Sequence, residues 1–107
     1  MRPVEPSVEL ISRPKIDWEE ITAYLEEVGG TAWSDRVRDQ ESPDSEDLLE
    51  FAGRMCYRSW EPGLNPNVGR VRTDSTQYLG NVVASQHGSV LEHASYTFIL
   101  HNVSRVF

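Results

Sequence analysis

Imidazole, hydroxyl and carboxylate groups lie close together just before the most apolar run of the sequence. His87 precedes Gly88-Ser89, and Glu92 follows two apolar residues. A glycine allows a ligand to approach the backbone closely. The segment 94–101 that follows is largely apolar or β-branched on both faces, which is typical of a strand covered on both sides. The pattern predicts a tight turn, fixed to a buried strand, that presents a ligand site.

The individual side chains of this turn allow more than one role. Ser89 lacks the Gly-x-Ser-x-Gly surroundings of a strained nucleophile, so we expect it to donate to a ligand oxygen or to cap the turn. Glu92 is a candidate buried acceptor for backbone N–H groups, or a partner for a ligand hydroxyl or ring nitrogen. We expect no catalytic residue among them.

Three histidines, His87, His93 and His101, raise the hypothesis of a small metal-binding protein. Their spacing places no pair on one helix face, and no cysteine or carboxylate cluster accompanies them. We therefore expect no metal site. His93 and His101 are interpreted as structural residues near the ends of the strand.

Cys56 is the only cysteine in the chain, so no internal disulfide can form and a reducing compartment is expected. Its position on the apolar stripe of a helix predicts a small core residue. Arg54, Arg58 and Arg105 are candidate phosphate contacts.

The charge distribution argues against binding to nucleic acid. The formal net charge is -7, with most of the acid between residues 17 and 50, whereas the second half carries a surplus of arginine. A nucleic-acid-binding surface needs the opposite balance. No apolar run approaches the ~20 residues of a membrane span, and the first residues lack the apolar core of a signal peptide. We expect a cytoplasmic protein that binds neither nucleic acid nor membrane.

The spacing of apolar residues predicts a mixed α+β fold with short strands and three helices in one domain, residues 1–107. Residues 1–6 are expected to be a flexible leader. The predicted elements are a strand over 7–12, a helix from Asp17 to Gly29-Gly30, a loop over 31–42, a helix opened by Ser42-Pro43, a helix from Asp74 or Ser75 to about Gln86, and a strand over 94–101 ended by Asn102. The second helix carries an apolar stripe of Leu48, Leu49, Ala52, Met55 and Cys56, with Gly53 marking close packing. The third predicted helix is expected to direct four side chains toward the core: Tyr78, Leu79, Val82 and Val83. Val103–Phe107 is predicted to begin another helix.

Three ordered blocks of sequence, 49–60 (LEFAGRMCYRSW), 87–98 (HGSVLEHASYTF) and 103–105 (VSR), resemble flavin-dependent thymidylate synthase. The resemblance covers residues 48–107 and extends loosely to 7–30. Members of this family are α/β homotetramers that convert dUMP to dTMP. Methylenetetrahydrofolate supplies the carbon, NADPH reduces the bound FAD, and each active site lies where subunits meet.

The resemblance also implies roles for single residues. Ser89 matches a residue that contacts FAD, His87 a histidine beside the flavin and folate, and Glu92 a carboxylate near the cofactor. Cys56 occupies a position where some relatives place a small FAD-contacting side chain, and is a weaker candidate.

The family signature, an Arg-His-Arg followed by a serine-rich segment, falls beyond Ser104-Arg105 and outside this chain. Those arginines hold FAD and the dUMP phosphate. We therefore expect a truncated N-terminal portion that carries the cofactor-side turn without the substrate site and is inactive alone. The alternative hypotheses are a non-catalytic oligomerising or regulatory module and the histidine metal-binding protein.

Overall fold

The computed structural model describes residues 3–61, 64–66, 68, 70–85 and 88–104, with the side chain of Tyr57 left out. Its elements within those residues are β1 (Ser7–Ser12), α1 (Trp18–Val28), α2 (Thr31–Asp39), α3 (Asp44–Tyr57), α4 (Ser75–Ala84), α5 (Gly88–Leu91) and β2 (Thr97–His101). The fold is therefore mixed α+β, as the sequence predicts. The described part holds five helices rather than three, because the sequence patterns did not indicate α2 or α5.

Helix α1 has the boundaries that its sequence predicts. The Asp17 side chain accepts a hydrogen bond from the backbone N–H of Glu20 at 3.3 Å, which satisfies one of the free donors of the first turn. Gly29 ends the helix in the left-handed region, at φ 83°, where a glycine carries no steric penalty. Leu25 faces the core, while the acidic residues of the helix are exposed to solvent.

The predicted loop over 31–42 is wrong for most of its length, because residues Thr31–Asp39 form α2. The helix buries Trp33 and Val37, an i, i+4 pair on one face. Gly30 immediately before it lies against Leu25 and Trp60, where an added Cβ would come within 2.8 Å of both side chains. The close approach that Gly30 allows brings α2 into the core.

Helix α3 buries a different face from the apolar stripe that the sequence predicts. Met55 and Cys56 are exposed, so their assignment to the core is wrong. The buried positions are Asp47, Glu50, Phe51 and Arg54. These follow the i, i+3, i+4, i+7 spacing of one helix face, but three of them are charged. The buried face of α3 is thus defined by polar pairing as well as by hydrophobicity.

Helix α4 begins at its predicted cap, where the Asp74 side chain accepts from the backbone N–H of Gln77 at 2.8 Å. Val82 is buried, whereas Val83 is 61% exposed, so its predicted inward orientation is wrong. The close packing predicted at Gly53 is confirmed, since an added Cβ would collide with the hydroxyl oxygen of Tyr78. This contact places α4 directly against α3.

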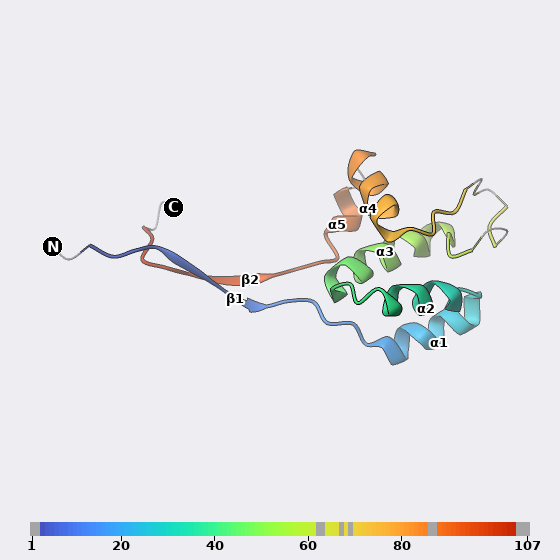
Figure 1. Cartoon of the computed structure of the whole chain (residues 1–107), viewed down its shortest axis with the longest axis horizontal. Helices are drawn as coiled ribbons and strands as arrows, with labels where there is room; N and C mark the ends of the chain where they lie inside the picture. The colour runs from blue at the N-terminus through green and yellow to red at the C-terminus, as the bar shows by residue number, and fades with distance from the viewer. Residues whose placement is uncertain (1–2, 62–63, 67, 69, 86–87, 105–107) are drawn as a thin grey trace.

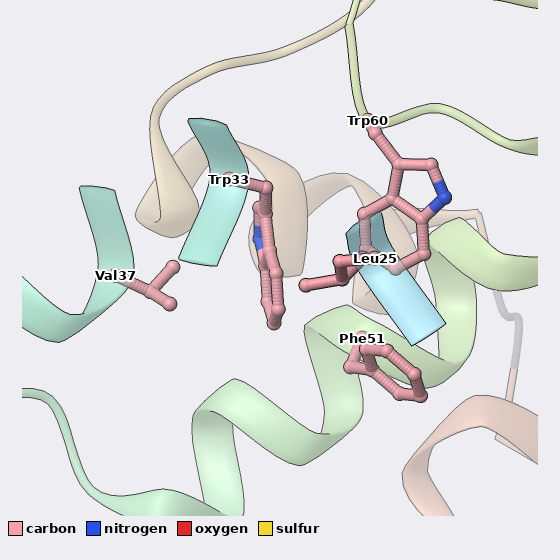
Figure 2. Close-up of a cluster of buried hydrophobic side chains, with 5 residues drawn as sticks. All are labelled: Leu25, Trp33, Val37, Phe51 and Trp60. Carbon is pink, nitrogen blue, oxygen red and sulfur yellow. The ribbon is translucent and has the colours of Figure 1, made fainter. Parts of the chain in front are cut away.

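The core lies among α1, α2, α3 and the segment that follows α3. Figure 2 shows its side chains directed toward one another: Leu25, Trp33, Val37, Phe51 and Trp60. The Trp33 ring lies 5.3 Å from that of Trp60 and 5.9 Å from that of Phe51, at tilted angles that aromatic pairs favour. Large aromatic surfaces allow so short a chain to bury a core.

The two strands form an antiparallel ribbon that extends away from the helices (Figure 1). Val8 pairs with Leu100, and Leu10 pairs with Phe98. The predicted burial of β2 on both faces is wrong within this chain, because Phe98, Ile99 and Leu100 are 53%, 41% and 48% exposed. The extents of 66 × 30 × 20 Å and the radius of gyration of 18.1 Å reflect the ribbon, since a compact chain of this size would have about 13 Å.

Asn102 ends β2, as predicted, with φ at 58° and its side-chain amide donating to the carbonyl of Glu5 at 3.0 Å. Val103 and Ser104 are not helical, and the rest of the predicted helix, 105–107, lies outside the described residues.

Candidate functional site

The predicted ligand-presenting turn forms a single helical turn, α5, followed by a hydrogen-bonded turn at residues 92–93. The backbone N–H groups of Glu92 and His93 donate to the carbonyls of Ser89 and Val90, each at 3.3 Å. Helix α5 contacts both α3 and α4. The two longer helices therefore hold the turn in place at one end of the body.

The polar residues of the turn that the structure describes are open to solvent. Ser89 and Glu92 are exposed, so the interpretation of Glu92 as a buried acceptor is wrong. Ser89 lies inside α5, Gly88–Leu91, rather than at its cap. His87 lies outside the described residues. Beyond the turn, Tyr96, which precedes β2, and Phe98 of β2 form an exposed aromatic pair whose stacked rings lie 6.4 Å apart.

Cys56 lies on α3, the helix that packs against α5, and its side chain is exposed. The structure thus places Cys56 on a helix next to the one that carries Ser89.

Arg54 is not the surface phosphate contact that the sequence suggested, because it is fully buried. Its guanidinium donates to the backbone carbonyls of Ser59 and Arg72 and pairs with Glu50 at 3.5 Å. It also lies over the ring of Tyr78, 4.2 Å from the centroid. Arg58 is exposed at the left-handed C-cap of α3, and Arg105 lies outside the described residues.

Glu50 is the acceptor at the centre of this polar network. It accepts from the indole N–H of Trp33, from the hydroxyl of Ser75 at 3.2 Å, and from Arg54. Sequence reasoning missed Glu50 because an acidic residue on a helix is usually solvated. The sequence signal that could have indicated a buried ion pair was the i, i+4 spacing of Glu50 to Arg54, beside a mid-helix glycine. The network connects α2, α3, α4 and the segment before α4.

Burial shifts the pKa values of two members of this network, Arg54 and Tyr78. Desolvation lowers the pKa of Arg54 from its ordinary value, and the charge of Glu50 opposes that shift. Desolvation also raises the pKa of Tyr78, while Arg54 beside the ring opposes it. Arg54 still carries its charge at neutral pH, and Tyr78 is a neutral hydroxyl donor.

A cavity of about 200 Å³ lies beside this network, between α3, α4, α5 and the segment that precedes α4. Its polar lining includes Arg54, Arg70, Arg72, Tyr78 and Asn81. Val90 of α5 closes one wall, so the cavity lies directly behind the exposed turn. It is too small for a dinucleotide, whose site needs several hundred Å³.

Within the described residues, no group of three or more histidine, cysteine, aspartate or glutamate side chains is arranged to hold a metal ion. His101 lies 3.5 Å from the Glu9 carboxylate, across the ribbon. This contact fits the structural role predicted for His101. His93 is exposed after α5. In the same described part, none of the helices combines the length and the apolar character that crossing a bilayer requires.

Comparison with known proteins identifies the family. The family model described as "Thymidylate synthase complementing protein" matches residues 38–107, and the chain belongs to this family. Among curated proteins, the chain is similar to the flavin-dependent thymidylate synthase of Mycobacteroides abscessus, with 48% identity over 58 residues. The corresponding proteins of Mycobacterium sp. strain JLS and Mycobacterium tuberculosis strain H37Ra are 47% and 43% identical.

Each of these matches covers 54% of this chain and 21% of the relative. The chain therefore aligns with about a fifth of the length of the curated relatives. No solved structure matches.

Proposed function

We propose that this chain is the cofactor-side portion of a flavin-dependent thymidylate synthase that makes dTMP from dUMP. The observation that carries the proposal is the family match over 38–107, which includes the exposed turn. Methylenetetrahydrofolate would donate the carbon and NADPH the reducing equivalents. Bound FAD would supply the hydride chemistry between them.

The residues of the turn fit one side of a flavin. A flavin site needs a flat apolar surface with a few directed polar groups. The exposed pair Tyr96 and Phe98 supplies apolar surface, and Ser89 and Glu92 supply a hydroxyl and a carboxylate in reach of solvent. In this proposal Ser89 donates to FAD and Glu92 accepts from it. The resemblance assigns His87, which lies outside the described residues, a role beside the flavin and folate, and it assigns Cys56 a weaker contact.

In the family that the chain resembles, the arginines of the Arg-His-Arg signature hold the substrate phosphate and part of the cofactor. Arg54, which is locked into the core, cannot replace them. A single exposed thiol without a disulfide partner is compatible with a reducing cytoplasm.

Assembly into a homotetramer, with the flavin shared between subunits, is part of the proposal. The exposed apolar ribbon supports it, because contiguous apolar surface of this kind is typical of interfaces. The same ribbon favours the alternative of a non-catalytic oligomerising module. The thymidylate synthase and the oligomerising module differ in that only the enzyme requires flavin and dUMP.

The deciding experiment assays dTMP formation from dUMP by the protein encoded by the complete reading frame, with FAD, NADPH and methylenetetrahydrofolate. We expect turnover that depends on FAD. Ser89→Ala should weaken FAD binding by about tenfold, the worth of one good hydrogen bond to a ligand. Ser85→Ala, an exposed serine that follows α4, should leave it unchanged.

An assembled protein that neither binds FAD nor methylates dUMP would contradict the enzyme and favour the oligomerising module. Equal loss of FAD affinity in Ser89→Ala and Ser85→Ala would remove the turn from the flavin site while leaving the enzyme in place.

A further inference from the structure

The cavity behind α5 combines positive charge with restricted size. Three arginines, Arg54, Arg70 and Arg72, line its roughly 200 Å³ together with Tyr78 and Asn81. No acidic side chain lines it among the described residues. Its apolar members, Val68, Val82 and Val90, leave room for a small organic group beside a charged one.

The charges of this cavity are not balanced within the described chain. Glu50 pairs with Arg54, which leaves the guanidinium groups of Arg70 and Arg72 without an acidic partner among the described residues. The chain as a whole carries a net charge of -7, so the charge of this cavity is opposite in sign to that of the whole chain. Two uncompensated cations match the charge of a phosphate dianion.

Buried hydrogen bonds hold the backbone of the cavity in place. The Arg54 guanidinium donates to the carbonyl of Arg72 and to that of Ser59, on two separate walls. Its Nε is buried and has no hydrogen-bond partner among the described residues. Arg70 is exposed and Arg72 half-buried, so their side chains can close on a ligand without disturbing this frame. Because the backbone of the cavity is already held in place before a ligand binds, the entropic cost of binding is reduced.

We propose that this cavity binds a small phosphate-bearing ligand. Arg70 and Arg72 contact the phosphate, and Tyr78 and Asn81 offer hydroxyl and amide donors beside it. Arginine suits this task because its planar fork bonds two phosphate oxygens at once. The site is distinct from the proposed flavin contact, since it lies on the inner side of α5 and is too small for a dinucleotide.

The test is isothermal titration of the purified chain with inorganic phosphate and, separately, with ribose 5-phosphate, at low and high NaCl. We expect saturable binding that weakens with salt. Arg70→Gln and Arg72→Gln should each weaken it by about tenfold, as expected for the loss of a charge-assisted hydrogen bond. Arg13→Gln, which removes the same charge from an exposed position outside the cavity, should not change it.

Thermal unfolding of each variant checks that the fold is retained. Tighter binding of ribose 5-phosphate than of phosphate would identify an organic phosphoester as the ligand, and equal binding would identify free phosphate. Absence of saturable binding of either probe would overturn the proposal, as would equal weakening by Arg13→Gln. Because no flavin, folate or dUMP is used, this outcome is independent of the proposed enzyme activity.

Discussion

The helical body and the β1–β2 ribbon use apolar residues in opposite ways. In the body, Leu25, Trp33 and Trp60 are at most 1% exposed and pack on one another (Figure 2). In the ribbon, Val8, Phe98 and Leu100 are each about half exposed and pair only across two strands. The body is stabilised by its own core, whereas the ribbon offers apolar surface that nothing in the described chain covers.

This difference separates what the chain stabilises alone from what it offers to other surfaces. An isolated two-stranded ribbon is marginally stable in water. A buried aromatic cluster contributes several kcal/mol. We therefore expect substitutions in the body to change the free energy of unfolding strongly, and substitutions in the ribbon to change association instead.

The largest expected effect comes from Trp33→Ala. The substitution removes a side chain that is 1% exposed and takes the indole donor away from Glu50. We expect the free energy of unfolding to fall by about 3–5 kcal/mol, measured by urea denaturation followed by circular dichroism. A loss below about 1 kcal/mol would show that the aromatic cluster is not the core of the body.

A second effect concerns Asp47 on the buried face of α3. The pKa of its carboxyl rises from 3.8 to about 6, chiefly through desolvation, with a hydrogen bond from Ser42 opposing and Glu50, Asp44 and Glu46 adding to the rise. The folded state thus binds this proton more tightly than the unfolded state. The stability it contributes is complete below the unfolded pKa and is lost as pH rises through about 6.

Asp47→Asn removes this titration and still offers Ser42 an acceptor. Between about pH 4 and pH 7, the wild-type chain should lose roughly 1–3 kcal/mol of stability relative to the variant. Urea denaturation across that range measures the difference. Parallel pH profiles for the two proteins would place Asp47 in solvent rather than in the body.

Two glycines in neighbouring helices, Gly53 and Gly80, allow a matched pair of substitutions to alanine. Gly53→Ala drives a Cβ into the Tyr78 hydroxyl, and overpacking of this kind costs about 1–3 kcal/mol. An added Cβ at Gly80 meets nothing within 4 Å, so Gly80→Ala should stabilise α4 by about 0.5–1 kcal/mol. Melting temperatures that move in the same direction for both variants would contradict the close contact of α3 with α4.

The smallest expected effect on stability comes from the ribbon. Phe98→Ala should change the free energy of unfolding by less than about 1 kcal/mol, because the side chain is 53% exposed. Sedimentation at increasing concentration should show weaker self-association than the wild type. A loss of stability as large as that of Trp33→Ala would place Phe98 in the core and remove the contrast between the two regions.

The sequence predicts the elements whose ends carry strong local signals. Asp17 and Gly29 bracket α1, and Asp74 begins α4, because caps act within one helical turn. The sequence does not predict α2, whose only apolar signal is the pair Trp33 and Val37. That pair becomes a buried face only because Gly30 allows α2 to approach Leu25. This approach is a tertiary contact, which local sequence patterns do not contain.

The candidate site also has one part that the sequence predicts and one part that it does not. The turn at Ser89 and Glu92 can be located from residue types, because polar and turn-forming residues precede an apolar strand. The polar face of α3 cannot, since Glu50 and Arg54 have the composition of a solvated helix face. Their burial depends on partners far away in sequence, Trp33, Ser75 and the carbonyl of Arg72.

Hydrogen–deuterium exchange of the chain at low concentration tests the central contrast most directly, because it reports the protection of both regions in one sample. We expect slow exchange for the amides of α1 and α3 and rapid exchange throughout β1 and β2. Rapid exchange in the helices, or a protected ribbon in the monomer, would contradict this contrast.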